Sequence, residues 1–188
     1  MEASSHNSFV HPLKFALWTG IGSIIMMFIA LTSAYIVRQA AGNWLEFKLP
    51  SIFMLSTFTI LLSSVTLQMA YSAFRKGQES SYKLLLLSTL ALGMIFILFQ
   101  YQGWLQMRAT GIELSGNPSG SFVYILSGLH VAHVIGGLGV LSLACYHAFT
   151  LPYKVTKRRL LRLQLTSQYW HFVDILWIYL FIFFMIQH

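Results

Sequence analysis

Four ionisable side chains lie inside long apolar stretches of this sequence. His130 and His133 are three residues apart in one stretch, and His171 and Asp174 are three residues apart in another. If both stretches are helical, each pair lies on one helix face. Ionisable groups in a hydrocarbon environment are costly and are kept where they meet a partner or line a hydrated path. These four residues are therefore the first candidates for chemistry.

Three kinds of chemistry are compatible with them. Imidazole is the commonest metal ligand, and histidines on facing helices bind haem when they lie at similar depth. With the last membrane segment entering near Gln168, His171 lies only about 5 Å below the boundary, against about 12 Å for His133. A proton path is the second possibility, although the first three apolar stretches contain no Asp or Glu. The third is a hydrogen-bonded cluster between helices, which we favour and which predicts a bond between His133 and Asp174.

The apolar stretches themselves define the fold. Of 188 residues, 12 are Lys or Arg, 5 are Asp or Glu, and 56% are hydrophobic. Fixed charges are thus about a third as frequent as in an average soluble domain, which excludes a disordered chain and indicates an integral membrane protein. A helix needs about 20 residues to cross the hydrocarbon core. We predict one domain over 1–188, an all-α bundle of five transmembrane helices at about 15–37, 50–74, 84–107, 121–149 and 168–186.

The residues that flank the fourth and first segments indicate where these helices begin and whether the first is retained. The turn formers of Ser115–Gly120 place the start of the fourth helix near Ser121. The first apolar run is too long for a signal-peptide core, and no small-residue cleavage site follows it, so we expect it to be retained. The polar tail that precedes it, about 13 residues long, shows no pattern.

Positive charges are unevenly divided between the two ends of the predicted bundle. One end collects nine Lys or Arg residues and the other has three. The positive-inside rule then places the N-terminus in the cytoplasm and the C-terminus outside. The nine residues are Lys14, Arg75, Lys76, Lys83, Lys154, Lys157, Arg158, Arg159 and Arg162.

The formal net charge of +7 does not indicate nucleic-acid binding, because basic residues gather on one membrane face as a topology signal. The same residues would also suit anionic lipid headgroups. Cys145, the only cysteine, lies within the fourth segment, so no internal disulfide is possible and we expect it to pack as a small apolar residue. No phosphate-binding loop, cysteine-pair metal motif or nucleophile elbow occurs. The basic residues that would suit anionic lipid headgroups are Lys157, Arg158, Arg159 and Arg162.

Two segments resemble signature helices of subunit III of cytochrome c oxidase and related haem-copper oxidases. Tyr169–Trp177, which reads YWHFVDILW, is similar to the final helix of that family. Ser127–Gly136, which reads SGLHVAHVIG, resembles its Gly-Phe-His-x-x-His-Val-Ile-x-Gly helix with one leucine in place of Phe. Leu92-Gly93 followed by Gln100 resembles the preceding helix. The similarity extends over about residues 13–186 and matches the short, five-helix form of the family.

The resemblance implies a subunit of a terminal respiratory oxidase, which passes electrons from cytochrome c to oxygen, forms water and moves protons outward. In this family haem and copper belong to subunits I and II. Subunit III has no catalytic, cofactor or metal residues; it stabilises the catalytic subunit, binds phospholipid and supports proton uptake in the bacterial cytoplasmic membrane. Five polar residues are then expected inside the subunit or at its interface with subunit I: His130, His133, His171, Asp174 and Gln100.

Several positions depart from the family pattern. Ile24, Gly103 and Gln164 stand where members of the family commonly have glutamates. These replacements favour a scaffolding role over a proton-conducting one. His147 occupies the place of a family arginine that lies near lipid headgroups, so the resemblance adds His147 to the basic residues expected to contact lipid.

Two other classes of function stay open at this point. One is subunit III of a quinol oxidase, or the accessory subunit of a nitric oxide reductase, both of which share the fold. The other is an independent membrane transporter or a haem-binding membrane cytochrome. An independent transporter or cytochrome predicts activity or a haem absorption band in the isolated chain. A subunit III predicts a colourless protein that copurifies with a haem-copper subunit.

Overall fold

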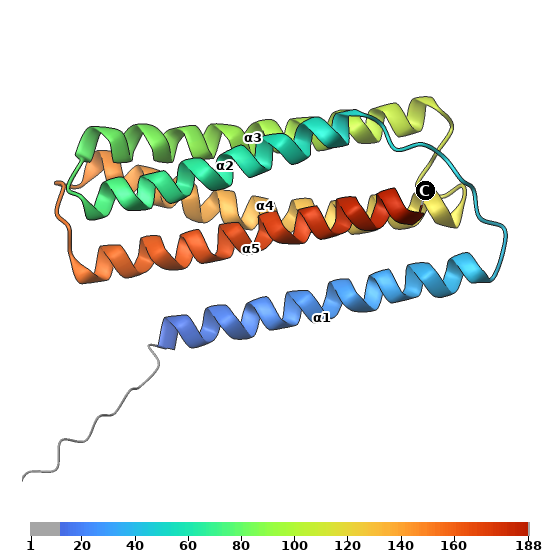
Figure 1. The fold of residues 1–188 in the computed structure, drawn as a ribbon, viewed down its shortest axis with the longest axis horizontal. Helices are drawn as coiled ribbons and strands as arrows, with labels where there is room; N and C mark the ends of the chain where they lie inside the picture. Colours follow the sequence, from blue (N-terminus) through green and yellow to red (C-terminus); the bar gives the residue numbers. More distant parts are fainter. Residues whose placement is uncertain (1–11, 188) are drawn as a thin grey trace, which may run out of the picture.

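The computed structural model describes residues 12–187 as five long α-helices without strands (Figure 1). Each helix is long and apolar enough to cross a membrane, which confirms the predicted all-α bundle. The polar tail up to residue 11 and the last residue, 188, lie outside the described residues. The helices are α1 (Pro12–Ala40), α2 (Ile52–Arg75), α3 (Glu79–Ala109), α4 (Pro118–Thr150) and α5 (Lys157–Gln187).

Helices α2 to α5 pack around a shared core, and α1 contacts only α4 and α5 among the described helices (Figure 1). A three-residue turn joins α2 to α3, and Gly77 within it has a φ of +76°, which suits glycine. Nine of the twelve Lys and Arg residues lie at the end where α1 and α5 begin. We call this the basic end; that it faces the cytoplasm stays a prediction.

The helices extend beyond the predicted apolar spans. Helix α5 begins at Lys157, eleven residues before the predicted start at 168, because Lys and Arg are good helix formers that can continue a helix into the headgroup layer. Helix α4 begins at Pro118, inside the predicted turn; the side chain of Asn117 accepts a hydrogen bond from the Ser119 N–H and caps it. His171 lies near the middle of α5, and its depth of about 5 Å below the membrane boundary stays a prediction.

Polar and aromatic contacts tie the second half of α1 to the bundle. The hydroxyls of Thr32 and Tyr179 on α5 are 2.9 Å apart. The Tyr35 ring packs edge-on against Trp44, with ring centroids 4.6 Å apart, and against Phe183 of α5 at 5.0 Å. The position of α1 therefore depends on a few contacts near one end of the bundle.

Trp170 forms the centre of the core, and two glycines make room for it. A Cβ atom at Gly93 would lie 2.9 Å from the Trp170 ring, and one at Gly137 would lie 3.0 Å from it. Small residues here let α3 and α4 approach α5 closely. Gly128 of α4, by contrast, faces outward, because a Cβ there would meet no atom within 4 Å.

Candidate functional site

Asp174 lies in the core of the bundle, between the buried Trp170 and Trp177 on the same face of α5. Its side chain is only 2% exposed, and neither carboxyl oxygen has a hydrogen-bond partner. The Ser64 hydroxyl is its polar neighbour, but the two are not in hydrogen-bonding geometry. Asp174 is thus a buried carboxyl without a hydrogen-bonding partner.

The predicted hydrogen bond between His133 and Asp174 is wrong. The Nδ1 of His133 lies 2.7 Å from the carbonyl oxygen of Leu129, one turn earlier on α4, and donates to it. The ring also packs edge-on against Phe28 of α1, with centroids 5.9 Å apart. His133 therefore faces α1, while Asp174 faces α2.

His171 belongs to the contact between α2 and α5. Its Nδ1 lies 2.5 Å from the Ser64 hydroxyl, and its Nε2 lies 3.3 Å from Oε1 of Gln68. Because the amide oxygen of Gln68 can only accept, Nε2 carries the proton and Nδ1 accepts from the Ser64 hydroxyl. This pairing turns His171 away from both histidines of α4.

His130 and Gln100 are completely buried, in the half of the core that lies away from the basic end. The His130 ring packs between Trp177 and Phe96, with centroid distances of 5.1 and 5.8 Å, and neither of its nitrogens has a hydrogen-bond partner. Gln100 donates to the Ser56 hydroxyl at 3.0 Å, and its Oε1 has no partner. The five predicted polar residues thus lie in separate places and do not form one hydrogen-bonded cluster.

Within residues 12–187, no group of three or more His, Cys, Asp or Glu side chains is placed to hold a metal ion. The histidines of α4 and α5 also fail to form a pair facing one another: His130 is enclosed by aromatic rings, and His171 points to α2. These described histidines of α4 and α5 therefore do not fit a haem.

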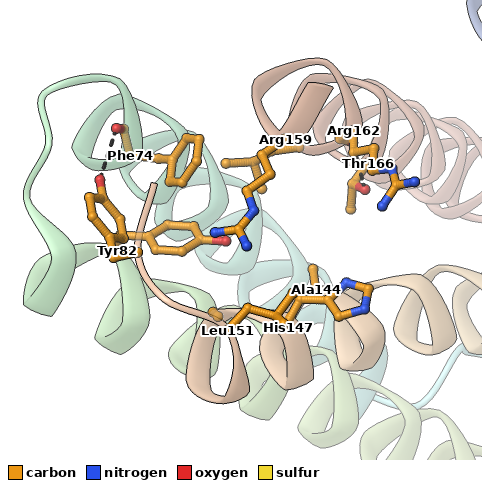
Figure 2. A pocket seen from close by; sticks show the side chains of 11 residues that line it. Phe74, Tyr82, Ala144, His147, Leu151, Arg159, Arg162 and Thr166 are labelled. Carbon is orange, nitrogen blue, oxygen red and sulfur yellow. Dashed lines mark hydrogen bonds between the residues drawn. The ribbon is translucent and has the colours of Figure 1, made fainter. Parts of the chain in front are cut away.

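A second feature, which we call the basic pocket, lies at the basic end between α4 and α5 (Figure 2). It has a volume of about 150 Å³. Figure 2 shows Arg159 reaching toward an aromatic wall, with Arg162 and His147 on the other side. The guanidinium of Arg159 donates to the Pro152 carbonyl at 2.8 Å. The pocket is lined by Phe74, Tyr82, Ala144, His147, Ala148, Leu151, Tyr153, Arg159, Arg162, Leu163 and Thr166.

The aromatic wall of the basic pocket comes from segments far apart in the sequence. The hydroxyl of Tyr153 donates to the Phe74 carbonyl at 3.1 Å, and the rings of Phe74 and Tyr82 have centroids 4.8 Å apart. Burial raises the pKa of Tyr153, with a smaller contribution from Glu79, so its hydroxyl stays protonated as this donor role requires. Sequence analysis did not identify these aromatic residues, because no local pattern links α2, α3 and the loop before α5.

The basic pocket adjoins an apolar groove between α1, α4 and α5 with a volume of about 630 Å³. Leu17 of α1 and Val140 of α4 line its apolar part, while His147 and Arg162 line both the groove and the pocket. Lys157 and Arg158 lie with Arg162 around a further hollow at the start of α5. All five residues predicted to contact lipid headgroups therefore lie in adjoining hollows: His147, Lys157, Arg158, Arg159 and Arg162.

Comparison with known proteins places this geometry in a family. The chain is 28% identical over 187 residues to a probable quinol oxidase subunit 3 of Staphylococcus saprophyticus, covering 96% of this chain and 90% of that protein. It is 33% identical to a probable cytochrome c oxidase subunit 3 of Nocardia farcinica and 30% identical to one of Mycobacterium leprae, each over 92% of this chain and 89% of the relative. The family model for cytochrome c oxidase subunit III matches residues 3–187. The chain therefore belongs to the cytochrome c oxidase subunit III family of haem-copper oxidases.

Proposed function

We propose that this chain is the non-catalytic subunit III of a terminal oxidase, which reduces oxygen to water with electrons from cytochrome c and moves protons outward. Its role is to stabilise the catalytic subunit, to hold phospholipid and to support proton uptake. Family membership and the five membrane helices support this role. Haem and copper then reside in subunits I and II, which are its partners, and the basic end faces the cytoplasm of a bacterium.

Deletion of the chain from its native host tests the scaffolding role. If subunits I and II hold the redox centres, membranes without this chain keep the haem absorption of the oxidase, while less intact complex survives extraction in detergent. Loss of the haem absorption together with the chain, with subunits I and II still present, would contradict a non-catalytic role.

The basic pocket and its apolar groove carry the lipid part of the proposal. Arg159 and Arg162 offer guanidinium groups for a phosphate, and the groove offers an apolar surface for an acyl chain. Attraction of a basic side chain to an anionic headgroup contributes about 1 kcal/mol. Replacing both arginines by glutamine should therefore weaken retention of anionic phospholipid about thirtyfold.

Native mass spectrometry of the intact complex measures this retention. The matched control is Lys76→Gln, which removes a positive charge from the same end of the bundle but outside the pocket. Equal loss of lipid in the control and in the double variant would show that only the overall charge of this end matters. Unchanged lipid in both would remove the lipid site from the proposal.

The electron donor is a finer question within the same family. Relatives named as quinol oxidase and as cytochrome c oxidase subunits match this chain at similar identity. We assign cytochrome c as the donor of the whole complex, and the sequence of the copurified subunit II tests this. A copper-binding domain there supports cytochrome c, and its absence would indicate a quinol.

A further inference from the structure

Helix α5 carries a line of polar residues that ends at the buried Asp174. Gln164, Ser167, His171 and Asp174 follow one another at spacings of three, four and three residues, so they lie along one face of the helix. The line begins two turns from the basic end and finishes at the middle of α5. Polar side chains in such numbers are unusual in the interior of a membrane helix.

Helix α2, which packs against α5, carries a matching line. Arg75, Tyr71, Gln68 and Ser64 are spaced by four, three and four residues and share one face. The Arg75 guanidinium lies 6.0 Å above the centre of the Tyr71 ring at the basic end. The two lines meet where Ser64 and Gln68 contact His171, and we call them together the polar seam.

Direct contacts connect the seam from the surface to the core. Gln68 is exposed, Ser64 and His171 are half-buried, and Asp174 is buried. Gln68 accepts from Nε2 of His171, whose Nδ1 is 2.5 Å from the Ser64 hydroxyl. Ser64 is also the polar neighbour of the Asp174 carboxyl. One continuous series of polar groups thus runs from the outer surface of the bundle to a carboxyl that no other group binds.

The alternative is that the seam only holds α2 and α5 together. Interhelical bonds with this purpose occur elsewhere in the same contact, where Trp170 donates to Ser63 and Trp177 donates to Thr57. Those groups are paired, as a packing role requires. Both oxygens of Asp174 are instead unpaired in the most buried position of the seam, which packing alone does not explain.

We propose that the polar seam is a proton-access path through which Asp174 exchanges its proton with water at the basic end. Rotation of the Ser64 hydroxyl brings it into hydrogen-bonding geometry with its neighbour Asp174. The carboxyl proton then passes to the Ser64 oxygen as the Ser64 hydroxyl proton passes to Nδ1 of His171. His171 in turn releases its Nε2 proton to water beside Gln68. The Asp174 carboxylate left behind then takes a proton back from water through the same groups in reverse order. Water returns a proton to Nε2 of His171, Nδ1 gives its proton to the Ser64 oxygen, and the Ser64 hydroxyl proton passes to the carboxylate. This return restores the starting state, so no net charge accumulates and water is the only reactant.

The path opens to one side only. Beyond Asp174, the next groups on this face are Trp177 and, on α2, Thr57, which are bonded to each other. The titratable group that α4 brings nearest is His130, which packs on the far side of Trp177. The described parts of α1 contain no Asp or Glu, and the acidic residue of α3, Glu79, is paired with Lys83 at the basic end. The seam therefore leads to an exchange site and does not cross the bundle.

Cysteine accessibility tests whether water enters the seam. The only native cysteine, Cys145, is buried, so the background is low. Gln68→Cys places a thiol in the seam, and Met69→Cys places one at the next position of α2, on an exposed face outside the seam. A thiol in apolar surroundings forms less of the reactive thiolate. With a charged, membrane-impermeant methanethiosulfonate, we expect Gln68→Cys to react at least about tenfold faster.

The reaction should occur from the same side of the membrane as labelling of Lys76→Cys, which marks the basic end. These measurements use the assembled oxidase in vesicles, after its subunit composition has been established. An unreactive seam then counts against the path and leaves the family role intact. Equal rates for Gln68→Cys and Met69→Cys, or labelling from the opposite side, would overturn the proposal.

Infrared spectroscopy of the same complex tests the exchange of the proton itself. The carbonyl band of a protonated Asp174 is identified as the band lost in Asp174→Asn, and its shift after transfer to heavy water gives the exchange rate. Gln68→Leu should slow this shift at least about tenfold, whereas Met69→Leu leaves it unchanged. Absence of the band, or the same rate in both leucine variants, would overturn the path.

Discussion

The fit of Trp170 between two glycines makes a sharp prediction about stability. In Gly137→Ala, the new methyl group would lie 3.0 Å from two atoms of the Trp170 ring and 3.2 Å from the Tyr169 ring. The Trp170 ring also lies close to the backbone of Gly93, where even an added Cβ would be only 2.9 Å from it, so it has little room to move. Helices α3, α4 and α5 would therefore have to separate.

The size of the effect follows from two opposing terms. Overpacking of a tight core costs about 1–3 kcal/mol. Alanine is favoured over glycine in a helix by up to about 1 kcal/mol. The net destabilisation expected for Gly137→Ala is about 1–2 kcal/mol, or a factor of about 5 to 30 in the unfolding equilibrium. Gly139→Ala is the control, because a Cβ there would meet no atom within 4 Å, and we expect it to be neutral or slightly stabilising.

Titration of the full-length chain with sodium dodecyl sulfate in mixed micelles, followed by tryptophan fluorescence, measures both variants under one set of conditions. The transition of Gly137→Ala should move to lower detergent fraction, and that of Gly139→Ala should stay in place or rise. If Gly137→Ala is as stable as Gly139→Ala, the close packing around Trp170 is not as described.

Three further substitutions test other contacts by the same titration. Ser63→Ala leaves the buried Trp170 N–H without its acceptor and should lower the stability of the chain by about 1–2 kcal/mol. Unchanged stability would mean that the Trp170 N–H does not become a buried, unpaired donor in the variant. Thr32→Val removes the hydrogen bond from α1 to Tyr179 and should lower the stability of the chain by about 0.6 kcal/mol. A much larger loss of stability would show that this hydrogen bond has a role beyond attaching α1 to α5. Asn117→Ala removes the N-cap of α4 and the hydrogen bonds to the α1–α2 loop. It should lower the stability of the chain by about 1 kcal/mol and speed proteolysis of that loop. An unchanged cleavage rate would contradict the role of Asn117 in holding the loop.

The number and placement of the helices could be predicted from sequence because charge is excluded from hydrocarbon at any position along a span. The start of α5 could not, because Lys157 and Arg158 lie before the apolar run and yet belong to the same helix. Apolarity marks the part of a helix inside the membrane, whereas hydrogen bonding and capping decide where it begins. The same limit explains the start of α4 at Pro118.

The contacts of the polar residues were harder to predict. Spacing shows that His130 and His133 share a helix, but it does not fix the rotation of that helix toward its neighbours. His133 therefore faces α1 rather than Asp174, and Gly137 rather than Gly128 meets Trp170. The basic residues of α5 that were predicted to contact lipid do line adjoining hollows, because they lie close together in the first two turns of that helix.

Affinity purification of this chain from native membranes, followed by an absorption spectrum and identification of the copurified proteins, tests its role as an accessory subunit most directly. We expect haem absorption in the purified complex, a haem-copper subunit among the copurified proteins, and no haem absorption in the chain once it is separated from them. A chain that purifies without such a partner, or that retains haem when isolated, would contradict the proposed function.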